Sequence, residues 1–148
     1  MTCNVLCIAT YHKGERFMRE AAALGAHVYL YTAERLLAQP WPREILTGVF
    51  AQRDGAPLAE TIKTVSYLAR THRFDRIVAL DDFDVETAAA LREHLRIPGM
   101  GDTTARYFRD KLAMRVKCRD LGILNQILFI SSPMTRYASS RAACRRRG

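Results

Sequence analysis

Apolar residues follow two alternating patterns along the chain. Short continuous apolar runs are typical of strands covered on both faces, and four such runs lie at 4–9, 27–31, 47–51 and 76–80. Apolar residues that recur every three or four positions predict helices, and this spacing occupies 13–24, 33–38, 57–72, 85–95 and about 104–121. Strands and helices therefore alternate at least four times. This order predicts an α/β, Rossmann-like fold with a mainly parallel sheet.

Certain residues mark where the predicted helices begin and end. Gly25 and Gly122 follow two of them, at the position where a left-handed residue usually closes a helix. Asp84 directly precedes the helix at 85–95 and is predicted to be its N-cap. Within the helix at 13–24, the side chains expected to pack inward are Phe17, Met18, Ala21 and Leu24.

The composition is that of an ordinary folded domain, with 49% hydrophobic and 26% charged residues in a chain of 148. No apolar run approaches the ~18–20 residues that a membrane helix needs, and the amino terminus lacks the pattern of a secretory signal. We therefore expect a cytoplasmic protein without a membrane partner. Its four cysteines are too scattered for a disulfide framework or a metal site, and we expect reduced thiols.

The net charge of +8 is unevenly distributed. Residues 125–148 contain five arginines and no acid, so residues 1–124 carry a net charge of only +3. This is too little for a nucleic-acid-binding surface across the fold. The change in composition predicts a separate, poorly ordered tail. Its arginines could attract phosphate backbones, but no aromatic or base-reading motif accompanies them, so nucleic acid is not the expected partner.

Candidate ligand-binding residues follow the first and last predicted strands. Ligands of open α/β sheets bind beyond the carboxyl ends of the strands, where the sequence places His12 and Lys13 after one strand and Asp81 and Asp82 after another. The first pair could meet an anion, and the carboxylates could hold a metal or polarise a substrate. A solvated loop and a capped turn account for the same residues. The first loop has a single glycine and so lacks a dinucleotide fingerprint.

The last predicted helix is amphipathic. A basic stripe of Lys111, Arg115 and Arg119 repeats every four residues beside an apolar stripe of Phe108, Leu112 and Val116. Such a helix either holds cations against phosphates or is an ordinary amphipathic helix with a solvated face.

The sequence also resembles a known family. LDDFDVETAAALREHLRIPGMG at 80–101, then FRDKLAMR at 108–115 and a helix ending in LGI, resembles the start of ATP-grasp ligases, above all carboxylate–amine ligases related to biotin carboxylase and carbamoyl phosphate synthetase. The resemblance covers about 4–124 and is strongest over 75–122. It implies a Rossmann-like pre-ATP-grasp domain at 1–102, the first helix of an ATP-grasp domain at 103–124, and an off-pattern tail at 125–148.

The resemblance implies an activity and a set of site residues. ATP-grasp ligases use ATP and Mg²⁺ to convert a carboxylate into an acyl phosphate, which an amine then attacks. Lys111 matches the family's first nucleotide-contacting lysine, whose ammonium offsets the charge on the ATP phosphates. The preliminary domain often helps to shape the substrate side, so His12, Lys13, Asp81 and Asp82 are the candidate substrate-binding residues. No catalytic residue and no metal ligand is assigned.

The chain departs from the family after LGI. The second phosphate-binding lysine, the glycine-rich flap and the magnesium ligands are not recognisable in the sequence. We therefore expect a truncated or frameshifted ligase fragment that has no activity of its own. The apolar stripe of its last helix would lack its usual cover and could drive self-association. The alternative is a non-catalytic Rossmann-like module that binds a small ligand or a protein.

Overall fold

The structure, a computed structural model, describes residues 2–123. Four strands form one parallel sheet in the order β3-β2-β1-β4. Their bounds are Asn4–Ala9 for β1, His27–Ala33 for β2, Leu46–Gln52 for β3 and Arg76–Ala79 for β4. The predicted α/β fold is therefore confirmed, and each strand lies within two residues of its predicted bounds.

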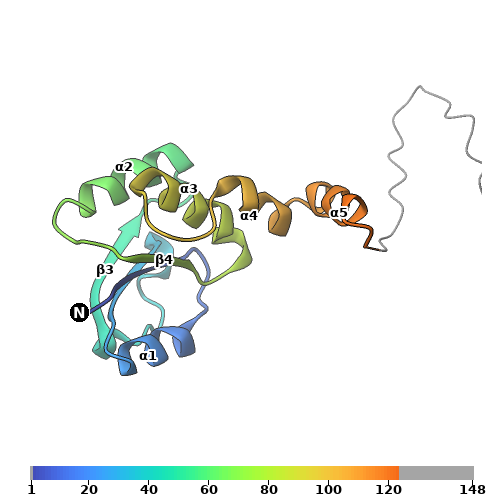
Figure 1. The fold of residues 1–148 in the computed structure, drawn as a ribbon. Coiled ribbons are helices and arrows are strands. Elements are labelled where there is room, and N and C mark those ends of the chain that lie inside the picture. Colours follow the sequence, from blue (N-terminus) through green and yellow to red (C-terminus); the bar gives the residue numbers. More distant parts are fainter. Residues whose placement is uncertain (1, 124–148) are drawn as a thin grey trace, which may run out of the picture.

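Helices cover both faces of this sheet (Figure 1). One face is covered by α1 (Glu15–Ala23) and the other by α2 (Leu58–Leu68) and α3 (Val85–Leu95). Short 3-10 turns lie at Glu34–Leu36, Arg43–Ile45 and Asp82–Asp84. The helix predicted at 33–38 is only the first of these turns, since Pro40 and Pro42 follow it closely and cannot continue a helix.

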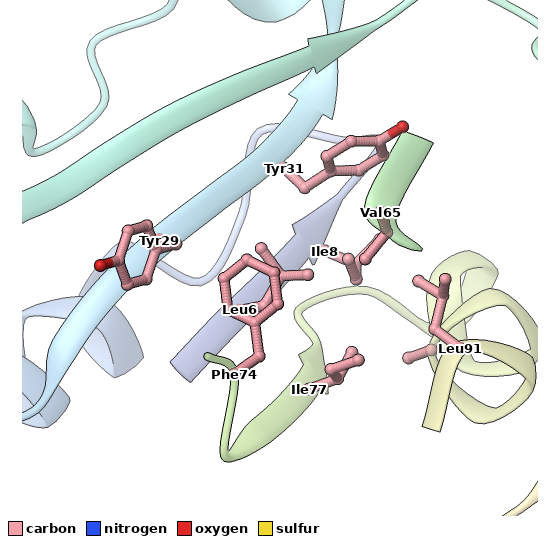
Figure 2. Close-up of a cluster of buried hydrophobic side chains, with 9 residues drawn as sticks. Leu6, Ile8, Tyr29, Tyr31, Val65, Phe74, Ile77 and Leu91 are labelled. Atoms are coloured by element: carbon pink, nitrogen blue, oxygen red, sulfur yellow. The ribbon is translucent and has the colours of Figure 1, made fainter. Parts of the chain in front are cut away.

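The alternating side chains of the strands supply a core on each face. Leu6 and Ile8 of β1 pack with Tyr29 and Tyr31 of β2 under α2 and α3, whose contribution includes Val65 and Leu91 (Figure 2). On the opposite face, the buried set comprises Val5, Cys7, Ala9, Met18, Val28, Leu30 and Trp41. Both faces of β1 are thus buried, which explains why its sequence reads as a continuous apolar run.

Two expectations about α1 and α3 were wrong. In α1, Met18 is fully buried, but Phe17 is 42% and Leu24 88% exposed, and Leu24 lies beyond the last helical residue. Asp84 occupies the N-cap position of α3 without capping it. Its carboxylate accepts hydrogen bonds from Thr10 at the end of β1 instead.

The predicted helix at about 104–121 is two helices, α4 (Asp102–Arg109) and α5 (Lys111–Asp120). The break falls at Asp110, whose backbone is extended with ψ 107°. Its carboxylate accepts hydrogen bonds from the N–H groups of Leu112 (2.8 Å) and Ala113 (3.1 Å). Aspartate competes in this way with the helical backbone, so it ends one helix and caps the next.

Together α4 and α5 form an arm, residues 102–120, that projects from α3 away from the sheet (Figure 1). Ala105 is the buried residue of α4, and α5 has none. The predicted uncovered apolar surface is present within the described residues, with Phe108 65%, Leu112 48% and Val116 38% exposed. The Arg-rich tail at 125–148 lies outside the described residues.

A buried arginine holds the segment that leads into the arm. Arg92 of α3 is 9% exposed, and its guanidinium donates to the carbonyl of Ile77 in β4 and to that of Met100, both at 2.8 Å. A side chain at Gly99 would collide with Arg92, since an added Cβ would lie 2.6 Å from its Cδ. Burial lowers the pKa of Arg92, but its two carbonyl partners satisfy the charge locally.

Candidate functional site

The carboxyl ends of the strands meet in a hollow of about 290 Å³. The loop after β1 contributes Thr10 and Tyr11, and the loop after β4 contributes Phe83 and Asp84. The remaining lining comes from the end of β2 and the 3-10 turn after it, from the end of β3 and the loop after it, and from the first turns of α2 and α3. Its polar members are Arg35, Gln52, Thr61 and Thr87. This strand-tip cleft lies where parallel α/β sheets bind their ligands.

Two of the predicted site residues form an ion pair beside the cleft. The Lys13 ammonium lies 2.6 Å from Oδ2 of Asp81, whose side chain is 1% exposed, whereas that of Lys13 is 62% exposed. The backbone N–H of Phe83 donates to the other oxygen of Asp81 at 3.1 Å. These partners lower the pKa of the Asp81 carboxyl to about 2, the hydrogen bond from Lys13 being the largest cause. The same contact raises the pKa of Lys13.

Gly14 allows the loop after β1 to pack directly against Leu80, the residue that follows β4. Its φ is +83°, a conformation that favours glycine, and a Cβ there would lie 2.7 Å from Cδ1 of Leu80. Gly14 is also the N-cap residue of α1. Gly14, the single glycine of this loop, is not part of a dinucleotide fingerprint but is required for packing between the two loops.

Asp84 forms a second connection between the two loops. Its carboxylate accepts hydrogen bonds from the backbone N–H of Thr10 at 2.9 Å and from the Thr10 hydroxyl at 2.7 Å. Burial raises the pKa of Asp84, and the bonds from Thr10 oppose this shift. Asp84 is 1% exposed and therefore holds the β1 and β4 loops together from inside.

Asp82 faces the arm rather than Lys13. Its Oδ2 lies 2.7 Å from Nη1 of Arg109 in α4. The guanidinium of Arg109 also lies over the Phe83 ring, 4.8 Å from its centroid, and Phe83 stands 5.1 Å from Tyr11. The two carboxylates that the sequence places side by side thus serve different partners.

Four polar residues of the cleft were missed by the sequence analysis: Arg35, Gln52, Thr61 and Thr87. Arg35 donates to the Thr10 carbonyl at 2.7 Å and pairs with Asp54 at 2.5 Å. Thr61 donates to Oε1 of Gln52 at 2.7 Å, which leaves the amide NH₂ group of Gln52 as a donor. Arg35 and Gln52 could have been found by applying the strand-end rule to β2 and β3 as well as to β1 and β4.

His12 does not join the other predicted site residues. It is exposed, and its ring packs edge-on against Trp41, 4.6 Å away between centroids. Trp41 belongs to the core on the α1 face of the sheet. His12 therefore marks the outer side of its loop, away from the cleft.

Lys111 is the first residue of α5 and is exposed. It forms no ion pair with any residue of the described chain and is not among the residues that line the cleft. Within residues 2–123, position 111 thus presents an exposed lysine at the start of α5, beside the Asp110 cap.

The described residues do not fit a magnesium or triphosphate site. Asp81 and Asp82 already form ion pairs with Lys13 and Arg109. Within residues 2–123, no group of three or more His, Cys, Asp or Glu side chains could hold a metal ion. No helix in this part of the chain is long and apolar enough to cross a membrane.

Two solved structures, a ligase and a biotin carboxylase domain, share the fold of this chain. L-amino acid ligase from Bacillus licheniformis superimposes with a TM-score of 0.70 and 19% identity, over 82% of this chain and 30% of that one. The biotin carboxylase domain of 2-oxoglutarate carboxylase from Hydrogenobacter thermophilus, crystallised as a dimer with MgADP, ADP and bicarbonate, superimposes with a TM-score of 0.58 and 20% identity, over 82% and 28%. The chain thus spans about 30% of the length of these proteins.

Sequence comparison points to the same family. No curated protein sequence matches the chain significantly. The ATP-grasp N-terminal domain family, however, matches residues 18–99, more than half of the chain. This match begins within α1 at Met18 and includes the three strands β2–β4, the helices α2 and α3, and the loop that carries Asp81 and Asp82. The chain, with its parallel sheet and strand-tip cleft, therefore belongs to the ATP-grasp N-terminal domain family.

Proposed function

We propose that residues 2–123 form the amino-terminal part of an ATP-grasp ligase, which joins a carboxylate to an amine at the expense of ATP. The observation that carries the proposal is the family match over residues 18–99, on a sheet whose strand ends form an open cleft. In this proposal, the loops that carry Lys13, Asp81 and Asp82 face the carboxylate substrate. The arm carries Lys111 toward the nucleotide.

The same proposal holds that this chain does not turn over ATP by itself. Stabilising a transferring phosphoryl group requires several fixed cations and a metal that converge on its oxygens. Lys111 is a single exposed ammonium, and Asp81 and Asp82 are already neutralised by Lys13 and Arg109. The remaining groups would come from sequence that this chain does not recognisably contain, as in a truncated or frameshifted ligase.

A nucleotide-binding experiment tests the role of Lys111. Hydrogen exchange of the purified chain is measured with and without MgADP, in the native protein and in Lys111→Ala. Slower exchange in α5, lost in Lys111→Ala, supports the proposal. The matched control is Lys63→Ala, which removes an exposed lysine from α2 and should leave the effect intact. Protection that survives in Lys111→Ala would contradict the nucleotide role.

Two further measurements test inactivity and truncation. Release of ADP from ATP by the purified chain, abolished in Lys111→Ala, would contradict the claim that the chain is inactive. The nucleotide sequence tests truncation: a shifted frame downstream of codon 124 should encode a glycine-rich flap and an acidic metal motif. If no frame encodes them, the frameshift is wrong.

A second function is a non-catalytic module that binds a small ligand in the strand-tip cleft. The cleft favours it, because Arg35 and Gln52 place polar groups in its lining and Lys111 is not among the described residues that line it. Ligand protection that depends on Arg35 or Gln52 and is indifferent to Lys111→Ala would select this function. The exposed apolar residues of the arm also support self-association, which sedimentation over a range of protein concentrations would detect.

A further inference from the structure

The arm meets the rest of the chain along α4, which packs against α3, and at the polar contacts that the end of α4 makes with the β4 loop. Ala105 is the buried residue of α4, and α5 has no buried residue. Apolar burial therefore fixes the first half of the arm weakly and the second half hardly at all. The direction of α5 therefore depends on a few individual contacts: Lys117 of α5 lies 5.6 Å from the centroid of the Tyr107 ring in α4, and polar contacts lie close to the break between the two helices.

Arg109 makes such contacts immediately before the break. Its Nη1 lies 2.7 Å from Oδ2 of Asp82, and its guanidinium covers the Phe83 ring at 4.8 Å. The Arg109 side chain is 26% exposed, whereas that of Asp82 is 65% exposed. An ion pair and a cation–π contact made by one planar guanidinium constrain both its position and its orientation.

Asp110, the next residue, starts α5. Its carboxylate accepts hydrogen bonds from Leu112 and Ala113 and so fixes the first turn of the helix, which begins with Lys111. Two consecutive side chains thus perform complementary tasks. Arg109 attaches the end of α4 to the β4 loop, and Asp110 sets the origin of α5 relative to that attachment.

From this arrangement we infer that Arg109 is a positioning residue, which holds α5 in one direction relative to the strand-tip cleft by binding Asp82 and Phe83. It thereby determines where Lys111 stands. The arm's direction depends on contacts within this chain, whereas the consequence for nucleotide binding rests on the proposed role of Lys111. Arg109 itself is not expected to touch the substrate or the nucleotide.

The native cysteines allow a direct distance measurement. Cys3 is exposed beside β1, and Cys118 lies in α5 with intermediate exposure, whereas Cys7 is buried and should stay unlabelled. Spin labels on Cys3 and Cys118, with Cys144→Ser as the background, report the separation of arm and sheet. A single narrow distance distribution is expected for this background protein.

Arg109→Gln should broaden that distribution and speed amide exchange at the α4–α5 junction by roughly threefold to tenfold, the range expected for losing one ion pair and one cation–π contact. Arg106→Gln removes an exposed arginine one turn earlier in α4 and is the matched control. It should leave both the distribution and the exchange unchanged. Unchanged far-UV circular dichroism in both variants shows that the sheet and its helices remain folded.

A charge exchange distinguishes positioning from a general structural role. Asp82→Arg alone should broaden the distribution, and Asp82→Arg combined with Arg109→Asp should narrow it part of the way, since the exchange restores the ion pair but not the cation–π contact with Phe83. Failure of the double variant to narrow the distribution, or an unchanged distribution in Arg109→Gln, would overturn the inference. Two results together would leave the positioning role intact and reject only the proposed nucleotide contact. These are a broader distance distribution in Arg109→Gln and a slowing of exchange by MgADP that persists in Lys111→Ala.

Discussion

The sheet with its covering helices and the arm have similar amphipathic sequences but opposite burial. Leu91 of α3 is fully buried against the sheet, whereas Leu112 of α5 is 48% exposed. Both residues lie on apolar stripes with helical spacing, so the pattern alone does not decide whether a stripe is covered. The difference depends on what the rest of the chain places opposite each helix. A periodic pattern therefore predicts a helix more securely than it predicts a core.

Truncating a leucine in each region should give the largest contrast. Leu91→Ala creates a cavity in the core under α2 and α3 and should lower the free energy of unfolding by about 2–5 kcal/mol. Leu112→Ala removes a half-exposed side chain and should change it by less than about 0.5 kcal/mol. Urea denaturation of the two variants provides the measurement. Comparable losses would mean that the arm unfolds together with the sheet.

Two glycines with similar backbone angles test the loop contact below the cleft. Gly14→Ala forces a Cβ against Leu80 at φ +83° and should cost about 2–4 kcal/mol in unfolding free energy. Gly25→Ala, at φ +87° with nothing within 4 Å, should cost only about 1–2 kcal/mol. The difference between their denaturation midpoints isolates the steric term. Equal midpoints would show that the β1 loop can move away from β4.

Removing the cap of α5 should affect the arm alone. Asp110→Ala deletes the acceptor for two backbone N–H groups, which is worth about 1 kcal/mol or about fivefold in local amide exchange. Exchange of α5 amides should accelerate by that factor, while the urea midpoint of the whole protein stays constant. Asp120→Ala, at the other end of α5, is the control and should not accelerate exchange in the first turn. A shifted midpoint would indicate that the arm is coupled to the sheet.

The smallest expected effect is the loss of stability in acid when the Lys13–Asp81 ion pair is broken. It is small because Lys13 is largely exposed and solvent screens the pair. The pKa of Asp81 is 3.8 in its ordinary state and about 2 when bound to Lys13, so the unfolded chain takes up the proton first as the pH falls. The stabilisation is therefore present above pH 3.8 and is lost between pH 3.8 and about pH 2. Asp81→Asn should flatten this part of the curve of urea midpoint against pH.

Asp84 has the opposite sign and provides the control for this titration. Its pKa is raised by burial, so the folded chain takes up the proton first and acidification relieves a penalty. Asp84→Asn should therefore steepen the acid loss rather than flatten it. A flatter curve in both variants would contradict the assignment of the two carboxyls.

The strands were predictable because their local pattern and their burial agree. β1 is covered on both faces, so each of its side chains must be apolar, and a run such as VLCIA shows this without further information. The strand-end rule likewise identified the loops that carry Lys13 and Asp81, which the structure brings to 2.6 Å. Order along the chain and sheet topology were sufficient for both results.

Other features depend on partners that no local pattern specifies. Asp84 has the sequence position of a cap, yet its carboxylate accepts hydrogen bonds from Thr10, which is far away in sequence. Asp110 lies within a continuous helical pattern, and the break appears only in the structure, where its backbone is extended and its carboxylate binds the following turn. Polar side chains have several partners of similar energy, and tertiary structure selects among them. Apolar side chains have fewer such choices.

The buried guanidinium of Arg92 has a consequence for the route of the chain. It donates hydrogen bonds both to the carbonyl of Met100 and to the carbonyl of Ile77 in β4. The chain therefore leaves the sheet along a fixed path before α4 begins. Whatever follows residue 101 starts from an exit whose position is determined by α3. If another segment or a fusion partner replaced the arm, it would therefore start from the same position and in the same direction after residue 101.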